Sequence, residues 1–290
     1  VALWIVMGNT LVIVTYRTYI PLRTVANIFI IHLAVADELT GLACLILLPV
    51  RYVPLELICS FAFQLINPLL ITIPFFASLH FLLMVSIDRF IAIFWPLRYQ
   101  TIMTNKRAIM TSCAIWLLCV LYYLTIVIDI TFQFKSNPEQ AILHCAKYAT
   151  IPEFMMKTFG VLYILVLIPQ IVIYSCIFMT AKTQQNKMQT TNGATLSRSN
   201  IAKMNFKLVK TPLIVIGLFE VCWTPLVVFL TAIQFDWLDY DTVYMGMFIS
   251  YIFAIINSGM NPIIYAVRST NFRIGMRKVL KLKSNTVENM

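Results

Sequence analysis

Several polar side chains stand inside stretches of the sequence that are otherwise apolar. Asp37 lies among aliphatic residues, and Asn257 and Asn261 follow each other by one helical turn in a later apolar stretch. An ionised carboxylate in such surroundings costs free energy unless it is paired, hydrated or bound to a cation. We therefore expect Asp37, Ser78, Asn257 and Asn261, together with Asn9, to form one polar cluster. The alternative is a structural aspartate that only accepts hydrogen bonds from its neighbours.

A second pair of residues that could take part in function is Asp88-Arg89, at the end of the third long apolar stretch. An acid beside an arginine at the edge of a membrane-length helix can hold the guanidinium until another partner takes it. Ser78 precedes Arg89 by eleven residues, almost three helical turns. Phe75 and Ile71 then lie on the same face, so one helix face carries a guanidinium, a hydroxyl and apolar side chains in order.

Membrane-length helices are needed to position these residues. The 290 residues are 60% hydrophobic and 12% charged, with a mean hydropathy of +0.83. This composition excludes a soluble domain, in which about a quarter of residues are charged. Because a helix needs about 20 residues to cross the ~30 Å apolar core, we predict an all-α membrane protein. Its seven transmembrane helices form a bundle and cover residues 1–16, 25–50, 58–93, 108–131, 155–180, 208–233 and 243–267.

The net charge of +10 is distributed along the chain as in a membrane protein and does not indicate a nucleic-acid partner. If residues 17–24 face the cytoplasm, 18 of the 22 lysines and arginines lie on that side. This bias predicts an extracellular N-terminus and a cytoplasmic C-terminus, here in the plasma membrane. The chain opens within an apolar stretch and without an initiator Met, so we expect the N-terminus to be incomplete.

Residues 270–282 predict a short amphipathic helix after the last transmembrane helix. Phe272 and Met276 fall on one side of it, and Arg273 and Arg277 fall on the other. Such a helix suits the anionic inner surface of a lipid bilayer. By contrast, residues 132–154 and 182–203 are polar without apolar periodicity, and we predict loops there.

The motifs around these positions resemble those of rhodopsin-like (class A) G-protein-coupled receptors. Asp88-Arg89 resembles the cytoplasmic end of their third helix, Cys222-Trp223-Thr224-Pro225 their sixth-helix hinge, and Asn261-Pro262 with Tyr265 their seventh helix. The resemblance implies one receptor domain over residues 1–290. It implies a non-enzymatic receptor that converts binding of an extracellular ligand into activation of a heterotrimeric G protein, with arrestin as a further candidate partner.

The resemblance also implies which residues switch the receptor and couple it to the G protein. Pro225 removes a backbone hydrogen bond and kinks the sixth helix, so that its inner half can swing outward. Phe219 lies one turn from Trp223 and could transmit a push from the pocket, although both could also be core aromatics. The implied set is Asp88, Arg89, Leu97, Phe219, Trp223, Pro225, Asn261, Pro262 and Tyr265.

Two further features follow from the resemblance. The family binds sodium at the position of Asp37, which implies an allosteric sodium site formed by Asp37, Ser78, Asn257 and Asn261. No lysine occurs between residues 211 and 267, which excludes a retinal Schiff base at the family position, and we expect no other cofactor.

The usual disulfide of the family is rearranged in this sequence. The cysteine expected 25 residues before Arg89 is replaced by Gln64, and the nearest cysteine is Cys59. A bridge from Cys59 to Cys145 in the loop after the fourth helix is sterically allowed, but the sequence does not require it.

The ligand is not fixed by the sequence. The predicted pocket is mostly apolar, which favours a lipid or another apolar small molecule. The acids at its mouth would instead attract a cationic peptide: Glu56, Asp129, Glu153, Asp236, Asp239 and Asp241. A weaker likeness to melanocortin and adenosine-type receptors, around Tyr99 to Thr104, implies no ligand because their ligand-binding acids are not reproduced. The pocket residues are Ile71, Thr72, Phe75, Leu226, Leu230, Met247 and Tyr251.

Residues that differ from the family pattern leave alternative functions open. Pro169 and Tyr174 are five residues apart instead of eight, so a decoy that binds ligand without signalling is an alternative. Glu220 in the sixth helix must be either protonated or paired. A small-solute transporter would need internal repeats, which we do not find.

Overall fold

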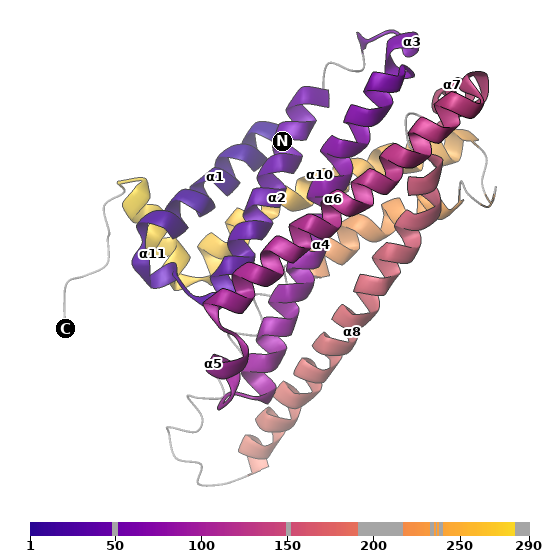
Figure 1. The fold of residues 1–290 in the computed structure, drawn as a ribbon. Helices are drawn as coiled ribbons and strands as arrows, with labels where there is room; N and C mark the ends of the chain where they lie inside the picture. The colour runs from indigo at the N-terminus through magenta and orange to yellow at the C-terminus, as the bar shows by residue number, and fades with distance from the viewer. Residues whose placement is uncertain are drawn as a thin grey trace.

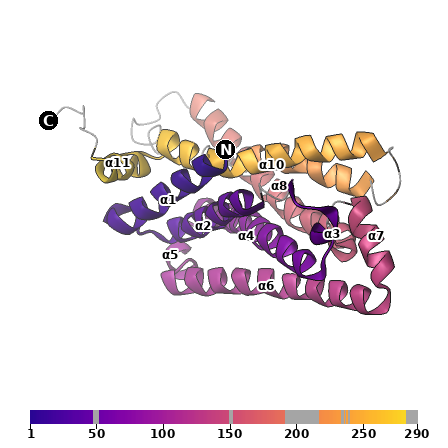
Figure 2. The ribbon, with the colours of Figure 1, turned by 90° about the horizontal axis from the view of Figure 1, so that it is seen from above.

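The computed structural model describes residues 1–47, 52–148, 152–190, 217–232, 235, 237 and 240–281. Within these residues, long helices run side by side as an elongated bundle (Figure 1). Seen from above, α6 lies along one side of the bundle and α10 along the opposite side, with α2 and α4 between them (Figure 2). The long helices are α1 (Ala2–Thr18), α2 (Val25–Leu47), α4 (Phe61–Phe94), α6 (Asn105–Ser136), α8 (Glu153–Thr190), the helix Gly217–Ala232 and α10 (Tyr240–Arg268).

The short helices lie at the two ends of the bundle. One end carries α3 and α7, and the other end carries α5 and α11 (Figure 1). The short elements are η1 (Ile20–Leu22), α3 (Leu55–Ile58), α5 (Tyr99–Ile102), α7 (Pro138–Tyr148) and α11 (Thr270–Val279).

Five of the described helices contain a segment long and apolar enough to cross a membrane: α2, α4, α6, Phe154–Thr180 of α8 and Met245–Arg268 of α10. α1 has 17 residues, and the apolar helix Gly217–Ala232 is also shorter than a full crossing. Of the predicted transmembrane ranges, residues 48–50, 208–216 and 233 lie outside the described residues. The surface of α6 exposes Leu117, Leu118 and Ile128, and such an apolar face is suited to lipid.

Two predicted loops are wrong in part, because the structure has helix there. α8 continues to Thr190, well past the predicted end at residue 180. Within the predicted outer loop 132–154, α6 extends to Ser136 and α7 follows it. The polar composition of these segments led to the prediction of loops, although Ala141 and Cys145, one turn apart, form a buried face of α7.

Hydroxyl side chains cap several of these helices. Ser60 accepts a hydrogen bond from the backbone N of Phe63 at 3.4 Å at the start of α4. Thr104 accepts one from Arg107 at 3.3 Å at the start of α6. Each cap satisfies a backbone donor that has no partner inside its helix. The polar residues of the loops thus fix where these helices begin.

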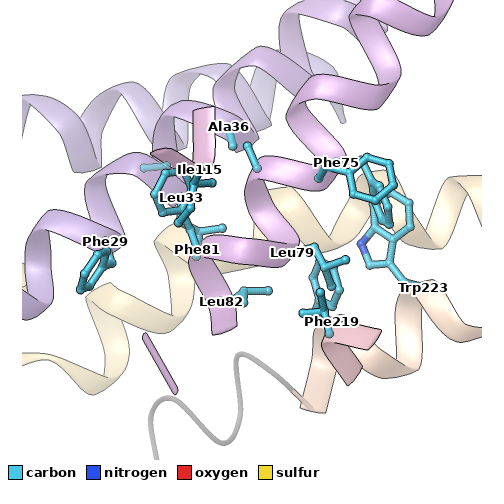
Figure 3. Close-up of a cluster of buried hydrophobic side chains, with 14 of the residues drawn as sticks. Phe29, Leu33, Ala36, Phe75, Leu79, Phe81, Leu82, Ile115, Phe219 and Trp223 are labelled. Carbon is cyan, nitrogen blue, oxygen red and sulfur yellow. The ribbon is translucent and has the colours of Figure 1, made fainter. Parts of the chain in front are cut away.

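The centre of the bundle is an apolar core around α4. Phe81 and Leu82 of α4 are fully buried and cluster with Phe29 and Leu33 of α2 and Ile115 of α6 (Figure 3). The indole Nε1 of Trp116 donates to Nδ1 of His32 at 3.1 Å, and His32 stacks on Phe81. This core holds α2, α4 and α6 in a fixed register, which positions the polar residues described next.

Candidate functional site

Asp37 is the centre of a polar cluster that joins three helices. Its side chain on α2 is only 1% exposed. Oδ1 of Asp37 accepts a hydrogen bond from Oγ of Ser78 on α4 at 3.3 Å, and Oδ2 accepts one from Nδ2 of Asn261 on α10 at 2.7 Å. The structure therefore brings together three of the residues that the sequence assigned to a cation site.

Asn9 and Asn257, also expected in this cluster, each have a buried side-chain oxygen. Asn9 donates to the carbonyl oxygens of Ile5 at 3.0 Å and Ser258 at 3.1 Å, which ties α1 to α10. Among the described residues, no donor reaches Oδ1 of Asn9 or Oδ1 of Asn257, and both side chains are buried. Buried oxygen atoms without donors are ligands suited to water or a hard cation. The donor set of Asp37, Ser78, Asn257 and Asn261 thus fits a sodium ion.

An aromatic stack lies on the same face of α4, beyond Ser78. The ring of Phe75 is 4.2 Å from Trp223, centroid to centroid, and Phe219 stacks on Trp223 at 5.7 Å. Figure 3 shows Phe75 from α4 facing Trp223 from the helix Gly217–Ala232. A displacement of Phe75 would therefore act directly on the helix that contains Pro225.

The predicted pocket residues are all buried or partly buried. Thr72, Phe75, Leu226 and Leu230 are buried, and Oγ1 of Thr72 lies 3.6 Å from Sδ of Met155. The other three predicted residues are partly buried and pack against the same core: Ile71, Met247 and Tyr251.

At the other end of α4, Asp88 holds two partners. Its carboxylate forms an ion pair with Arg89, in which Nε of Arg89 donates to Oδ2 at 2.9 Å. Oδ1 accepts a hydrogen bond from the hydroxyl of Tyr99 on α5 at 2.7 Å. Burial and then the negative charge of Asp88 raise the pKa of Tyr99 above its ordinary value, so the phenol stays a donor. Leu97, between these elements, is 97% exposed.

Comparison with known proteins identifies this arrangement. A family model described as 7 transmembrane receptor (rhodopsin family) matches residues 8–265 of the chain. The chain belongs to the rhodopsin family of seven-transmembrane receptors. The match spans all seven long helices, so α1 and the helix Gly217–Ala232 complete the seven-helix bundle.

Curated relatives with similar sequences carry different ligand names. The chain is 30% identical to somatostatin receptor type 5 of Rattus norvegicus, with 95% of the chain and 74% of the relative covered. It is 26% identical to the allatostatin-A receptor of Bombyx mori, covering 94% and 75%. It is also 26% identical to adenosine receptor A3 of Ovis aries, covering 97% and 87%.

As a member of this family, the protein is a G-protein-coupled receptor and a multi-pass membrane protein that responds to an extracellular ligand. The family is one of receptors and not of enzymes. The relatives' names differ in ligand, so they do not assign one to this receptor.

At the end of the receptor that carries α3 and α7, Cys59 and Cys145 form a disulfide across 86 residues, with their Cα atoms 5.7 Å apart. Nε2 of Gln64, which replaces the usual cysteine, lies 3.1 Å from Sγ of Cys145. The rearranged bridge therefore still ties the start of α4 to the segment between α6 and α8.

The acids predicted around the pocket mouth are described only in part. Oδ2 of Asp129 accepts hydrogen bonds from Nε2 of Gln133 at 2.8 Å and from the backbone N of Phe154 at 3.4 Å. Asp236 and Asp239 lie outside the described residues.

Sequence reasoning missed a polar contact between α8 and the sixth helix of the receptor. The hydroxyl of Tyr163 on α8 donates to Oε2 of Glu220 at 2.5 Å and lies 3.1 Å from Oγ1 of Thr224. With its amide nitrogen facing Glu220, Gln170 donates to Oε1 at 2.7 Å. Glu220 thus accepts hydrogen bonds from two neutral side chains, and its protonation state remains a prediction. The available signal was the spacing of Tyr163 and Gln170, two polar residues seven apart in an apolar helix.

Tyr265 packs in a way that the sequence did not indicate. Its ring is buried and stacks on Phe272 of α11, with 5.4 Å between centroids. The resemblance places Tyr265 among the switch residues, and this role remains a prediction.

Proposed function

We propose that a ligand entering from the extracellular side acts on Phe75 and Trp223 and thereby changes the position of the helix around Pro225. The 4.2 Å separation of these two rings carries this proposal, because a displacement of Phe75 reaches Trp223 without an intervening group. Phe219, one turn from Trp223, stacks on the indole and passes the displacement inward.

The consequence at the inner end is release of Arg89. When the sixth helix moves away at its proline kink, Arg89 leaves Asp88 and contacts the G protein together with the exposed Leu97. This is a shift between two packings of one bundle, so an agonist must bind the open packing better than the closed one.

We further propose that Asp37, Ser78, Asn257 and Asn261 hold a sodium ion in the closed packing. A bound sodium ion would balance the charge of the Asp37 carboxylate. The four side chains come from α2, α4 and α10, so the site favours the packing in which these helices are close.

For the ligand, we propose a lipid or another apolar small molecule. The described pocket residues are mainly aliphatic and aromatic, and burial of apolar surface supplies most of the binding free energy for such molecules. We place the receptor in the plasma membrane with its N-terminus outside.

A ligand screen against a panel of G-protein sensors tests the proposal. Expressing cells should respond to apolar compounds, and Arg89→Ala should abolish the response while leaving ligand binding intact. Binding without nucleotide exchange on any G protein would favour a decoy, and uptake of labelled solute would favour a transporter. Signalling unaffected by Arg89→Ala would overturn the mechanism.

A further inference from the structure

We propose that a groove between α1, α10 and α11 binds one anionic phospholipid of the inner leaflet. The groove has a volume of about 480 Å³. Its lining combines an apolar part with two arginines: Leu11, Ala266, Val267, Leu280, Arg273 and Arg277. This inference rests on the proposed cytoplasmic placement of the end of the bundle that carries α11.

The wall formed by α11 is fixed in place before any lipid binds. Oγ of Ser269 accepts a hydrogen bond from the backbone N of Phe272 at 3.4 Å and caps α11. Phe272 and Met276 are buried. A Cβ atom on Gly275 would lie 2.5 Å from Cγ2 of Thr15 on α1, so α11 touches α1 with its backbone. A preformed wall of this kind spares a ligand the cost of ordering it.

The groove lies where the apolar core of the membrane ends. The membrane-spanning segment of α10 runs from Met245 to Arg268, and Ala266 and Val267 belong to its last turn. Val267 is 64% exposed and Leu280 is 52% exposed. An acyl chain that packs on these side chains would cover apolar surface that the protein itself leaves open.

The arginines provide the complementary charge. Arg273 and Arg277 are one helical turn apart and therefore lie on one face of α11. Nη1 of Arg273 lies 3.4 Å from the carbonyl oxygen of Val267, which keeps its guanidinium beside the apolar part. Guanidinium groups bind phosphate in a bidentate geometry, and anionic lipids are concentrated in the inner leaflet.

Other occupants match the groove less well. A free phosphate ion would use the arginines but leave the apolar side chains in water. A zwitterionic lipid would cover the apolar part but carry no net charge for two arginines. A second receptor could also cover the groove if the two copies were related by a twofold axis through it. The arginine pairs of both copies would then face each other, and their like charges would oppose this contact.

Lipid retention by the purified receptor tests the proposal. The whole chain in mild detergent is mixed with phosphatidylserine or phosphatidylcholine, and bound lipid is counted by native mass spectrometry. We expect one retained phosphatidylserine and a much weaker phosphatidylcholine signal. Arg273→Ala with Arg277→Ala should weaken phosphatidylserine binding more than about 100-fold, because each lost hydrogen bond between a guanidinium and the phosphate costs about 1.5 kcal/mol or more.

Lys278→Ala with Lys281→Ala is the matched control. It removes two positive charges from the same end of the chain, at positions that do not line the groove. Binding should fall much less than in the arginine variant, and an equal loss in both would show diffuse attraction and overturn the groove.

A second variant and a competitor test whether lipid binding needs the open shape of the groove as well as the charge of its arginines. Ala266→Trp keeps every charge but fills the groove, and it should also lose phosphatidylserine. Displacement of the lipid by inorganic phosphate, or full binding to Ala266→Trp, would contradict the proposal. No G protein is present in this assay, so its outcome does not depend on the proposed signalling mechanism.

Discussion

The hydroxyl of Tyr99 donates to Oδ1 of Asp88 at 2.7 Å while Arg89 occupies Oδ2 of the same carboxylate. One buried acid therefore links α5 to the arginine proposed to contact the G protein. Tyr99 orients the carboxylate so that its other oxygen faces Arg89. The hydrogen bond thus favours the closed packing of the receptor.

Tyr99→Phe should raise basal activity. Loss of a hydrogen bond to a charged group costs about 1.5–3 kcal/mol. If half of this cost destabilises only the closed packing, basal nucleotide exchange rises about 4- to 13-fold. The measurement is ligand-free exchange in membranes with matched receptor amounts. Tyr52→Phe is the control, because Tyr52 is almost fully exposed, and equal exchange by both variants would refute the role of Tyr99.

Basal exchange should not depend on ionisation of Tyr99 at ordinary pH. Burial and the Asp88 charge raise the pKa of Tyr99, so the stabilisation is fully present below the ordinary value of about 10. It is lost only when the pH rises through the raised value. We therefore expect the ratio of basal exchange in Tyr99→Phe and in the wild type to stay constant from about pH 7 to pH 9. A ratio that falls toward one across this range would contradict the assignment.

Asp37→Asn should abolish stabilisation by sodium. A ligand that binds only the folded state at a hundredfold excess over its Kd stabilises that state by about 2.7 kcal/mol. Thermal unfolding of the purified receptor in NaCl, compared with KCl at equal ionic strength, should show this shift in the wild type only.

Glu38→Gln is the control for the sodium experiment. Glu38 follows Asp37 directly but accepts from Oγ1 of Thr10 on α1 at 2.7 Å. Its replacement should leave the sodium effect intact. A sodium effect that survives in Asp37→Asn would exclude the proposed site.

The sequence predicted the Asp37 cluster well because the physics there allows few alternatives. Asp37, Ser78 and Asn261 each need a polar partner in an apolar bundle, so the bundle must bring them together. Glu220 had the same need, but its partner depended on the rotation of α8 relative to the sixth helix. That rotation is set by packing along both helices, which a single sequence does not display. Tyr163 and Gln170 could therefore not be assigned to Glu220 in advance.

The contact between Tyr163 and Glu220 should appear as an energetic coupling. Tyr163→Phe removes the donor and Glu220→Leu removes the acceptor of the 2.5 Å hydrogen bond, so the double variant should lose less stability than the sum of the single losses. The expected interaction energy is about 0.5–3 kcal/mol, measured by thermal unfolding. Tyr122→Phe with Glu220→Leu is the control cycle, since the Tyr122 hydroxyl contacts Oγ1 of Thr158 at 2.6 Å. Additive losses in the first cycle would contradict the contact.

Gly275 should tolerate no side chain unless α1 is altered opposite it. A Cβ atom there would meet Cγ2 of Thr15 at 2.5 Å and Cδ1 of Tyr19 at 3.1 Å, and forced overpacking costs about 1–3 kcal/mol. Gly275→Ala should therefore lower the unfolding temperature. Thr15→Ser removes only the Cγ2 atom, so it should change little alone and restore part of the loss when combined with Gly275→Ala. Failure of Thr15→Ser to restore any stability would mean that α11 does not rest on α1 at this point.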